Sequence, residues 1–257
     1  MAATKPSSAA AVTRTPEKTL GVLGGMGPTA TAEFLRLLAA GAPATEDQQH
    51  PRIVLLSEPG IPDRTDALLS GDDEPARRVR EGLFTLAGWG AGLLAIPCNT
   101  AHAFLGRTVA ELPVPLVDIV DATLAEAMRL SPAGGWLTAT TGTLASGLYQ
   151  ERAAALGYRL HIPDGGTQKL IHDSAMRVKA NRIEEAARTF RAAVQSLWLR
   201  REVPVLAACT ELPIAYQGGA LPPEMAVSSL SALARACNGA LYGPARFSPR
   251  HDLRAAV

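Results

Sequence analysis

Short apolar runs alternate with amphipathic segments along most of the chain. Continuous apolar runs at residues 19–25, 52–57 and 91–97 have the length of buried strands. Between them, residues 29–42 and 74–90 carry apolar side chains at the three- and four-residue spacing that is typical of helices. Because strands that alternate with helices form parallel sheets, this half of the chain predicts an α/β fold.

The alternation then begins again in the second half of the chain. Apolar runs predict strands at residues 114–120, 134–140 and 203–209. Helical spacing recurs at residues 121–130 and 183–200. The second half therefore repeats the order of elements that the first half predicts.

Two local matches support an internal repeat. The stretch "GVLGGMGPTATAEF" resembles "GWLTATTGTLASGLY", and "GLLAIPCNTA" resembles "VPVLAACTEL". Gly27 and Cys98 are 71 positions apart, and Gly142 and Cys209 are 67 positions apart. Since ligands in open α/β sheets bind at the carboxyl ends of the strands, we expect two similar, pseudo-symmetric α/β domains with the active-site cleft between them.

The pattern also predicts where the domains begin and end. Residues 1–18 are rich in Ala, Ser, Thr and Lys and are interpreted as a disordered tail. Residues 19–117, together with a C-terminal helix at about 225–245, are predicted to form the first domain, and residues 118–224 the second.

Composition narrows the class of partner. The chain has 257 residues, 47% of them hydrophobic, which is enough for a full core. The formal net charge of +1 suggests neither nucleic acid nor an anionic membrane surface as partner, so a small molecule is expected. The first 18 residues lack the apolar segment of a secretory signal, and no apolar stretch has the length of a transmembrane helix. These features predict a cytoplasmic protein.

The chain has three cysteines, Cys98, Cys209 and Cys237. An odd number of widely spaced thiols fits neither a disulfide framework nor a structural zinc site, and we expect no metal. Cys237 has no counterpart in the other half and is interpreted as a buried structural residue.

Cys98 and Cys209 both follow predicted strands, and two facing domains would bring them to one cleft. Near neutral pH a thiolate serves as a base and a thiol as an acid. One acid and one base on opposite faces of a carbon are what racemisation requires, and the reaction needs neither a metal nor a redox cofactor. Asn99, Thr100 and Thr210 offer donors suited to a carboxylate beside these thiols.

Several ordered motifs resemble those of one known family. They are "GGMGP" at 24–28, "HPR" at 50–52, "IPDRT" at 61–65, "PCNTAH" at 97–102, "ATTGTLASGLYQERA" at 139–153, "VKA" at 178–180 and "ACTELP" at 208–213. Together they resemble the aspartate/glutamate racemase superfamily, most closely its aspartate-racemase-like branch. The resemblance implies a cofactor-independent amino-acid racemase without pyridoxal phosphate, built from two similar α/β domains and acting as a homodimer.

The resemblance also implies roles for individual residues. Cys98 and Cys209 match the family's two catalytic cysteines, and Arg64 and Lys179 match basic positions that would hold the side-chain carboxylate of an acidic amino acid. Seven further residues match substrate-binding positions: Met26, Gly27, Asn99, Thr100, Thr140, Thr143 and Thr210. We assign Glu211 a supporting role. Ser228 and Ser229 stand where relatives often carry an acidic residue.

Simpler interpretations of these residues remain open at this point. "GGMGP" fits a tight turn without ligand, Arg64 a solvated loop, and Lys179 the surface of a helix. His102 could pair with Cys98 as base and nucleophile, although a capping or packing role is commoner.

Alternative functions also remain open. The same cleft would serve for maleate isomerisation, hydantoin racemisation or malonate decarboxylation. A non-catalytic amino-acid-binding protein and a thiol redox switch are further alternatives.

Overall fold

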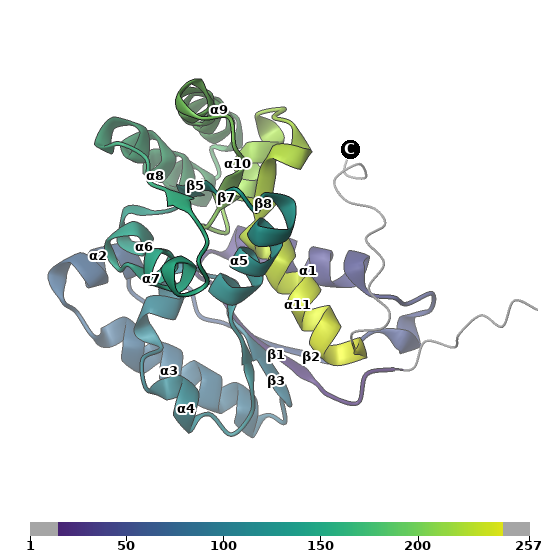
Figure 1. The fold of residues 1–257 in the computed structure, drawn as a ribbon. Coiled ribbons are helices and arrows are strands. Elements are labelled where there is room, and N and C mark those ends of the chain that lie inside the picture. Colours follow the sequence, from purple (N-terminus) through teal and green to yellow (C-terminus); the bar gives the residue numbers. More distant parts are fainter. Residues whose placement is uncertain (1–14, 244–257) are drawn as a thin grey trace, which may run out of the picture.

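The computed structural model describes residues 15–243 and contains two four-stranded parallel sheets (Figure 1). The first has the order β2-β1-β3-β4, and the second has the order β6-β5-β7-β8. The strands are β1 (Leu20–Gly24), β2 (Ile53–Ser57), β3 (Leu93–Ala95), β4 (Leu116–Val117), β5 (Gly135–Thr138), β6 (Leu160–His161), β7 (Val205–Ala207) and β8 (Ala226–Ser228). The predicted α/β class with two similar halves is confirmed.

Helices flank both sheets. They are α1 (Pro28–Gly41), α2 (Arg64–Ser70), α3 (Glu74–Gly88), α4 (Thr108–Glu111), α5 (Ile119–Leu130), α6 (Thr141–Ala145), α7 (Leu148–Ala155), α8 (Gly165–Lys179), α9 (Ile183–Arg200), α10 (Leu212–Gly218) and α11 (Ser229–Tyr242). Short 3-10 turns lie at Asp47–Gln49, Thr100–Phe104 and Pro223–Met225.

The elements differ from the expected pattern in a few places. The apolar run at 114–120 forms only the two-residue strand β4, because α5 already begins at Ile119, where Asp118 accepts hydrogen bonds from two backbone N–H groups of its first turn. Strand β6 has two residues and strand β8 three, which is too short to leave a periodic pattern. Of the predicted tail, residues 1–14 lie outside the described residues, and residues 15–18 contain no helix or strand.

Both sheets reverse their strand order at the same point. In the first sheet, β1 lies between β2 and β3, and in the second sheet β5 lies between β6 and β7. The loops that follow β1 and β3, like those that follow β5 and β7, therefore diverge to opposite sides. Such switch points at the carboxyl ends of parallel strands are where open α/β sheets bind ligands.

The two sheets share one central hydrophobic cluster. It contains Leu20 and Leu93 from the first sheet, Leu137 and Leu206 from the second, and Leu233 from α11. Two outer clusters lie between the first sheet and α3 and between the second sheet and helices α8 and α9. Helix α11 packs on both α1 and α5 (Figure 1). The domain boundaries at residues 117 and 224 stay a prediction, since the shared cluster joins the halves.

The turn after β1 shows how the sequence shapes the switch point. All five residues of β1 are buried, as expected for a central parallel strand covered on both faces. Gly25, which follows it, has a φ of 90°, and a Cβ there would lie 2.5 Å from the backbone nitrogen of Glu58. Only glycine fits such a turn, and α1 begins three residues later.

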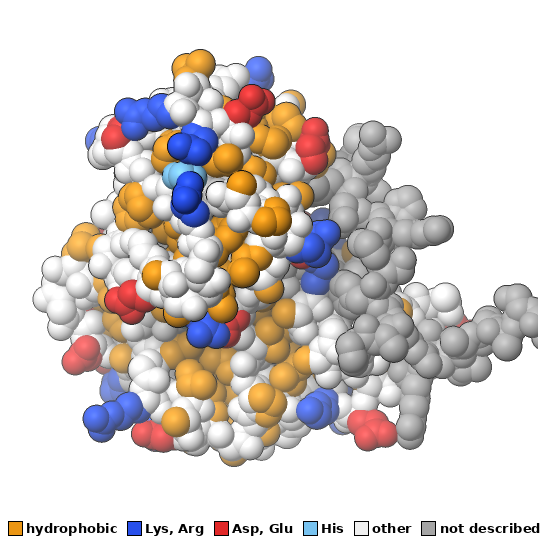
Figure 2. Space-filling model, viewed as in Figure 1, with side chains coloured by type: hydrophobic (Ala, Val, Ile, Leu, Met, Phe, Trp, Pro, Cys, Tyr) orange, Lys and Arg blue, Asp and Glu red, His pale blue; other side chains and the backbone are white. Residues whose placement is uncertain are grey.

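On the described part of the face drawn in Figure 2, basic and acidic side chains are interspersed rather than gathered by sign. Among residues 15–243, none of the helices combines the length and the apolar composition that crossing a bilayer requires.

We expect Leu233→Ala to lower the free energy of unfolding by about 2–5 kcal/mol, because Leu233 is fully buried in the shared cluster. Leu199→Ala is the matched control, since the Leu199 side chain is 90% exposed, and its change should stay within about 0.5 kcal/mol. Urea unfolding followed by circular dichroism measures both. Equal effects of the two substitutions would contradict the role of α11 in joining the halves.

Candidate active site

The strand ends of both halves converge on one small cavity. Cys98 lies three residues after the end of β3, and Cys209 lies two residues after the end of β7. Both thiols line the cavity, and both residues are buried, with 6% and 5% of their surface exposed. The structure thus brings together the two cysteines that the sequence analysis placed at strand ends.

Most of the residues that the sequence singled out line this cavity. Its complete lining is Met26, Asp63, Arg64, Thr65, Cys98, Asn99, Thr100, Thr140, Lys179, Cys209, Thr210 and Glu211. Gly27 and Thr143 are not among the lining residues but lie directly behind it. The sequence analysis missed Asp63 and Thr65, although the "DRTD" pattern of a helix start could have drawn attention to Asp63.

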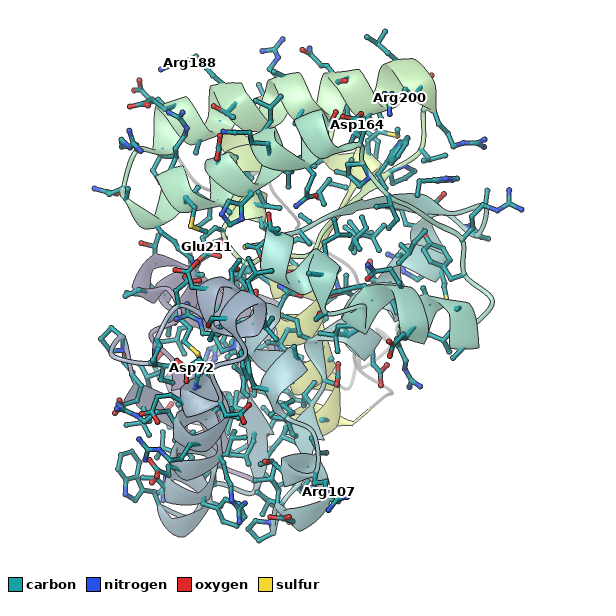
Figure 3. The ribbon with its side chains drawn as sticks, turned by 90° about the vertical axis from the view of Figure 1, so that its left-hand side faces the viewer. Asp72, Arg107, Asp164, Arg188, Arg200 and Glu211 are labelled. Atoms are coloured by element: carbon teal, nitrogen blue, oxygen red, sulfur yellow. The ribbon has the colours of Figure 1, made fainter. Side chains whose placement is uncertain are left out.

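The cavity is closed in this conformation. Its free volume is about 10 Å³, which is about the space that one water molecule needs. Figure 3 shows Glu211 at the level where the two halves of the molecule meet. An amino acid is larger than this space, so the cavity must widen before one can bind.

Glu211 holds the thiol of Cys209. The Sγ atom of Cys209 donates to Oε2 of Glu211 at 3.1 Å, and the hydroxyl of Thr210 donates to the same oxygen at 3.2 Å. Burial raises the pKa of Cys209 well above its ordinary value, and the negative charge of Glu211 adds to this, while Lys179 opposes it. Cys209 is therefore kept as a thiol in the closed cavity.

Gly27 leaves room for the same carboxylate. A Cβ at this position would lie 3.0 Å from Oε1 of Glu211 and 3.9 Å from Cγ of Lys179. Oε1 of Glu211 is buried and has no hydrogen-bond partner. Of the glycines in "GGMGP", Gly25 thus serves the turn and Gly27 the packing of Glu211.

Two basic side chains enter the cavity from different halves. The ammonium of Lys179, at the end of α8, lies 3.4 Å from Oδ2 of Asp63. Burial disfavours the charge of Lys179, yet Glu211, Cys209 and Asp63 together raise its pKa above the ordinary value. Asp63 also caps α2 by accepting from the backbone N–H of Thr65 and Asp66. Lys179 therefore joins the last turn of α8 in one half to the first turn of α2 in the other.

Arg64 is the first residue of α2 rather than part of a solvated loop. It is 8% exposed, and its Nη1 donates to the backbone oxygens of Ile61 and Pro62 at 3.0 and 2.9 Å. Its Nε is buried without a partner. A buried guanidinium N–H with no acceptor at the wall of the cavity is suited to a carboxylate.

Three threonine hydroxyls connect the halves across the cavity. The Oγ1 of Thr100 lies 2.8 Å from that of Thr143 and 3.1 Å from that of Thr140, and the last two lie 3.1 Å apart. Thr140 also caps α6 by accepting from the backbone N–H of Thr143. Nearby, a Cβ on Gly142 would lie 2.8 Å from Cα of Thr65, so α2 and α6 pack closely.

The amide of Asn99 is held on both sides by buried groups. Its Oδ1 accepts from the hydroxyl of Tyr149 at 2.5 Å, and its Nδ2 donates to the hydroxyl of Ser229 at 3.0 Å. Ser228, the neighbouring residue, caps α11 by accepting from the backbone N–H of Ser231. Ser228 therefore caps a helix, and Ser229 contacts the site through Asn99.

His102 supports the backbone rather than the thiol. Its Nε2 accepts from the backbone N–H of Ile119 at 3.4 Å, which assigns the ring proton to Nδ1, and Nδ1 donates to the backbone oxygen of Cys98 at 2.9 Å. Burial lowers its pKa, so the ring is neutral. The packing interpretation of His102 fits these contacts.

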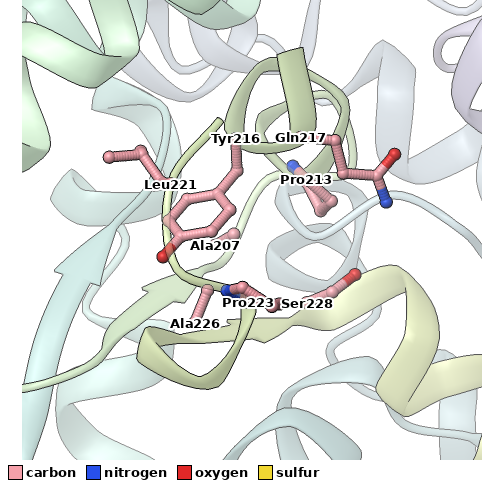
Figure 4. Close-up of a pocket in the computed structure, with 8 residues that line it drawn as sticks. All are labelled: Ala207, Pro213, Tyr216, Gln217, Leu221, Pro223, Ala226 and Ser228. Atoms are coloured by element: carbon pink, nitrogen blue, oxygen red, sulfur yellow. The ribbon is translucent and has the colours of Figure 1, made fainter. Parts of the chain in front are cut away.

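A second cavity lies beside α10 (Figure 4). Its volume is about 180 Å³, and it is lined mainly by apolar groups: Ala207, Pro213, Tyr216, Gln217, Leu221, Pro223, Ala226 and Ser228. It is larger than the cavity at the thiols, but its lining contains neither a cysteine nor a charged side chain. Within the described range, no three His, Cys, Asp or Glu side chains come together in an arrangement able to hold a metal ion.

The fold and the site define a class of protein with two α/β halves. Each half contains a parallel sheet covered by helices, and its switch point brings one thiol to a common cavity. Residues 23–237 match the model of the Asp/Glu/hydantoin racemase family, and the chain belongs to this family. It is thereby an isomerase of the racemase type.

Known proteins agree with this assignment. An aspartate racemase from Picrophilus torridus is 28% identical and superposes with a TM-score of 0.76 over 88% of this chain and 94% of that one. The broad specificity amino-acid racemase RacX of Bacillus subtilis (strain 168) is 27% identical over 206 residues, which cover 75% of this chain and 85% of that protein. Glutamate racemase isoform RacE1 from Bacillus anthracis, 19% identical with a TM-score of 0.64 over 88% of this chain and 82% of that one, shares the fold.

We expect Glu211→Gln to speed the alkylation of Cys209 by iodoacetamide at every pH below the pKa of the thiol. The substitution removes the negative charge that helps to raise this pKa, so a larger fraction is thiolate at a given pH. Peptide mass spectrometry measures the rate as a function of pH, with Glu184→Gln as control because the Glu184 side chain is 93% exposed. An unchanged pH profile for Glu211→Gln would contradict the electrostatic role of Glu211.

Proposed function

We propose that the protein racemises an acidic amino acid, aspartate first and glutamate second, with Cys98 and Cys209 as the two acid–base groups. The observation that carries the proposal is the pair of buried thiols, one from each half, in one cavity with amide and hydroxyl groups. The membership in a racemase family supports it. The proposed reaction uses neither pyridoxal phosphate nor a metal.

The reaction moves one proton to the substrate and one away from it. A thiolate removes the hydrogen on Cα as a proton, so an S–H bond forms and the C–H bond breaks. The electron pair remains on Cα and spreads into the α-carboxylate. The thiol on the opposite face then gives its proton to Cα and becomes the thiolate, which inverts the centre.

The surroundings of Cys209 assign it the role of acid in one direction. It is kept as a thiol by burial and by Glu211, which leaves Cys98 to take the proton from the substrate. In the other direction Cys209 must carry the thiolate, which the positive charge of Lys179 favours and the negative charge of Glu211 disfavours.

Stabilisation of the carbanion is assigned to fixed donors in a dry cavity. Asn99, Thr100, Thr140 and Thr210 lie in its wall with side chains that donate hydrogen bonds, and closure excludes water from the space between them. Donors that are already in place interact more strongly with developing charge in such a site than in water.

The preference for an acidic side chain rests on the two basic groups. The Nε of Arg64 has no partner and is available to a second carboxylate. The ammonium of Lys179 is paired with Asp63 and would share its charge with that carboxylate. The aspartate racemase of Picrophilus torridus supports aspartate as substrate, whereas the broad specificity of the Bacillus subtilis relative favours a wider range. Two further expectations remain proposals: that the protein forms a homodimer, and that it acts in the cytoplasm.

Replacing either Cys98 or Cys209 by Ser should slow the racemisation of aspartate by about 100-fold or more, because a hydroxyl is a far weaker base and acid than a thiol at neutral pH. Chiral chromatography without added cofactor measures the rate, and proton NMR in deuterated water measures exchange of the α-hydrogen. Cys237→Ala is the matched control, since Cys237 lies in the central cluster and not in the cavity. Wild-type rates in both serine variants would refute the proposal, and binding of aspartate without any racemisation would favour a non-catalytic binding protein.

Arg64→Met should raise the KM for aspartate by about tenfold or more while it changes the racemisation of alanine little, because in this proposal the side-chain carboxylate is the one part of the substrate that the guanidinium contacts. Methionine keeps most of the buried volume of the side chain. The comparison uses a panel of L-amino acids analysed by chiral chromatography. A parallel loss for aspartate and alanine would show that Arg64 acts in general packing instead.

A further inference from the structure

The contacts of Asn99 fix which way its amide points. Tyr149 lies on one side and Ser229 on the other, and all three residues are at most 2% exposed. Burial raises the pKa of Tyr149, so its hydroxyl remains protonated and donates. The hydroxyl of Tyr149 donates to Oδ1 of Asn99, and the amide nitrogen donates to Ser229. These two hydrogen bonds define the orientation of the amide, since a phenol hydroxyl can also accept.

This orientation leaves one N–H group for the cavity. An amide nitrogen has two hydrogens, and Ser229 accepts one of them. No other acceptor is bonded to Nδ2 of Asn99 within the part of the chain that the structure describes. Asn99 lines the cavity, so we infer that the second N–H is directed to a carboxylate bound there. A flipped amide would instead present its oxygen and repel the same carboxylate.

The two groups that hold Asn99 come from distant elements. Asn99 directly follows Cys98 in the first half of the chain, Tyr149 lies in α7, and Ser229 is the first residue of α11. The hydroxyl of Tyr149 is therefore a fixed donor that reaches the site from behind, without lining the cavity itself.

We propose that Tyr149 and Ser229 are positioning residues for the racemisation: by holding the amide of Asn99 they direct its free N–H to a substrate carboxylate. The inference rests on the proposed function, because it gives Asn99 a carboxylate as ligand. Neither residue touches the reacting atoms, and both act through Asn99.

The test compares Tyr149→Phe with Tyr216→Phe. Both substitutions remove one buried phenol hydroxyl, but the hydroxyl of Tyr216 donates to the backbone oxygen of Pro222, away from the thiols. Calorimetry measures the binding of succinate, a dicarboxylate that has no α-amino group to racemise, and proton NMR measures α-hydrogen exchange of aspartate. We expect Tyr149→Phe and Ser229→Ala each to lower the affinity for succinate and the rate of α-hydrogen exchange by about tenfold, the value of one hydrogen bond. Tyr216→Phe should leave the affinity and the rate unchanged.

A double-mutant cycle with Asn99→Ala separates positioning from general packing. If Tyr149 acts through Asn99, Tyr149→Phe has no further effect on succinate binding once Asn99 is replaced. An equal loss in both backgrounds, or binding by Tyr149→Phe as tight as by Tyr216→Phe, would overturn the inference. A third outcome would refute the proposed function and leave the positioning role intact. In that outcome the wild-type protein binds succinate and Tyr149→Phe does not, but the wild-type protein never exchanges the α-hydrogen of aspartate.

Discussion

The shared central cluster is the constraint on which the site depends. On the sides that face each other, the two sheets have no separate hydrophobic cores, because residues of β1 and β3 pack into the same cluster as residues of β5 and β7. The carboxyl ends of these four strands are consequently held at one place. Each strand end then needs only two or three further residues to bring a polar or sulfur-bearing side chain to the cavity, as Cys98 and Cys209 do.

Closure brings charges and hydroxyls into contact that would be far apart in separated halves. Lys179 meets Asp63, and Thr100 meets Thr140 and Thr143. These groups satisfy one another, so few polar atoms of the cavity wall lack a partner among the described residues. The exceptions are Oε1 of Glu211 and Nε of Arg64, and both lie where a bound ligand would change their surroundings.

Local patterns predicted the order of the main strands and helices and the two cysteines at strand ends. The other residues of the cavity wall, such as Arg64 and Lys179, were expected there from the resemblance to the racemase family. Apolar runs define β1 and β7, and a cysteine or a glycine-bearing turn directly after a strand lies at the switch point by topology. Asp63, Tyr149 and Ser229 could not be predicted in this way. Their contacts join residues 116, 50 and 130 positions apart, so they depend on how α2, α7 and α11 pack, which leaves no periodic pattern in the chain.

The pseudo-symmetry of the site ends at the two cysteines, since Asn99 follows the first and Thr210 the second, and the position after these differs as well. Glu211 stands there in the second half, and Thr100 stands there in the first, so only one of the two thiols has a carboxylate as neighbour. Mirror-image amino acids nevertheless have equal free energies in water, and the equilibrium constant of a racemisation is one. The ratio kcat/KM must therefore be the same for both enantiomers, however unequal the two thiols are. The charge of Glu211 can therefore lower the KM for one enantiomer relative to the other only if it lowers the kcat for that enantiomer by the same factor.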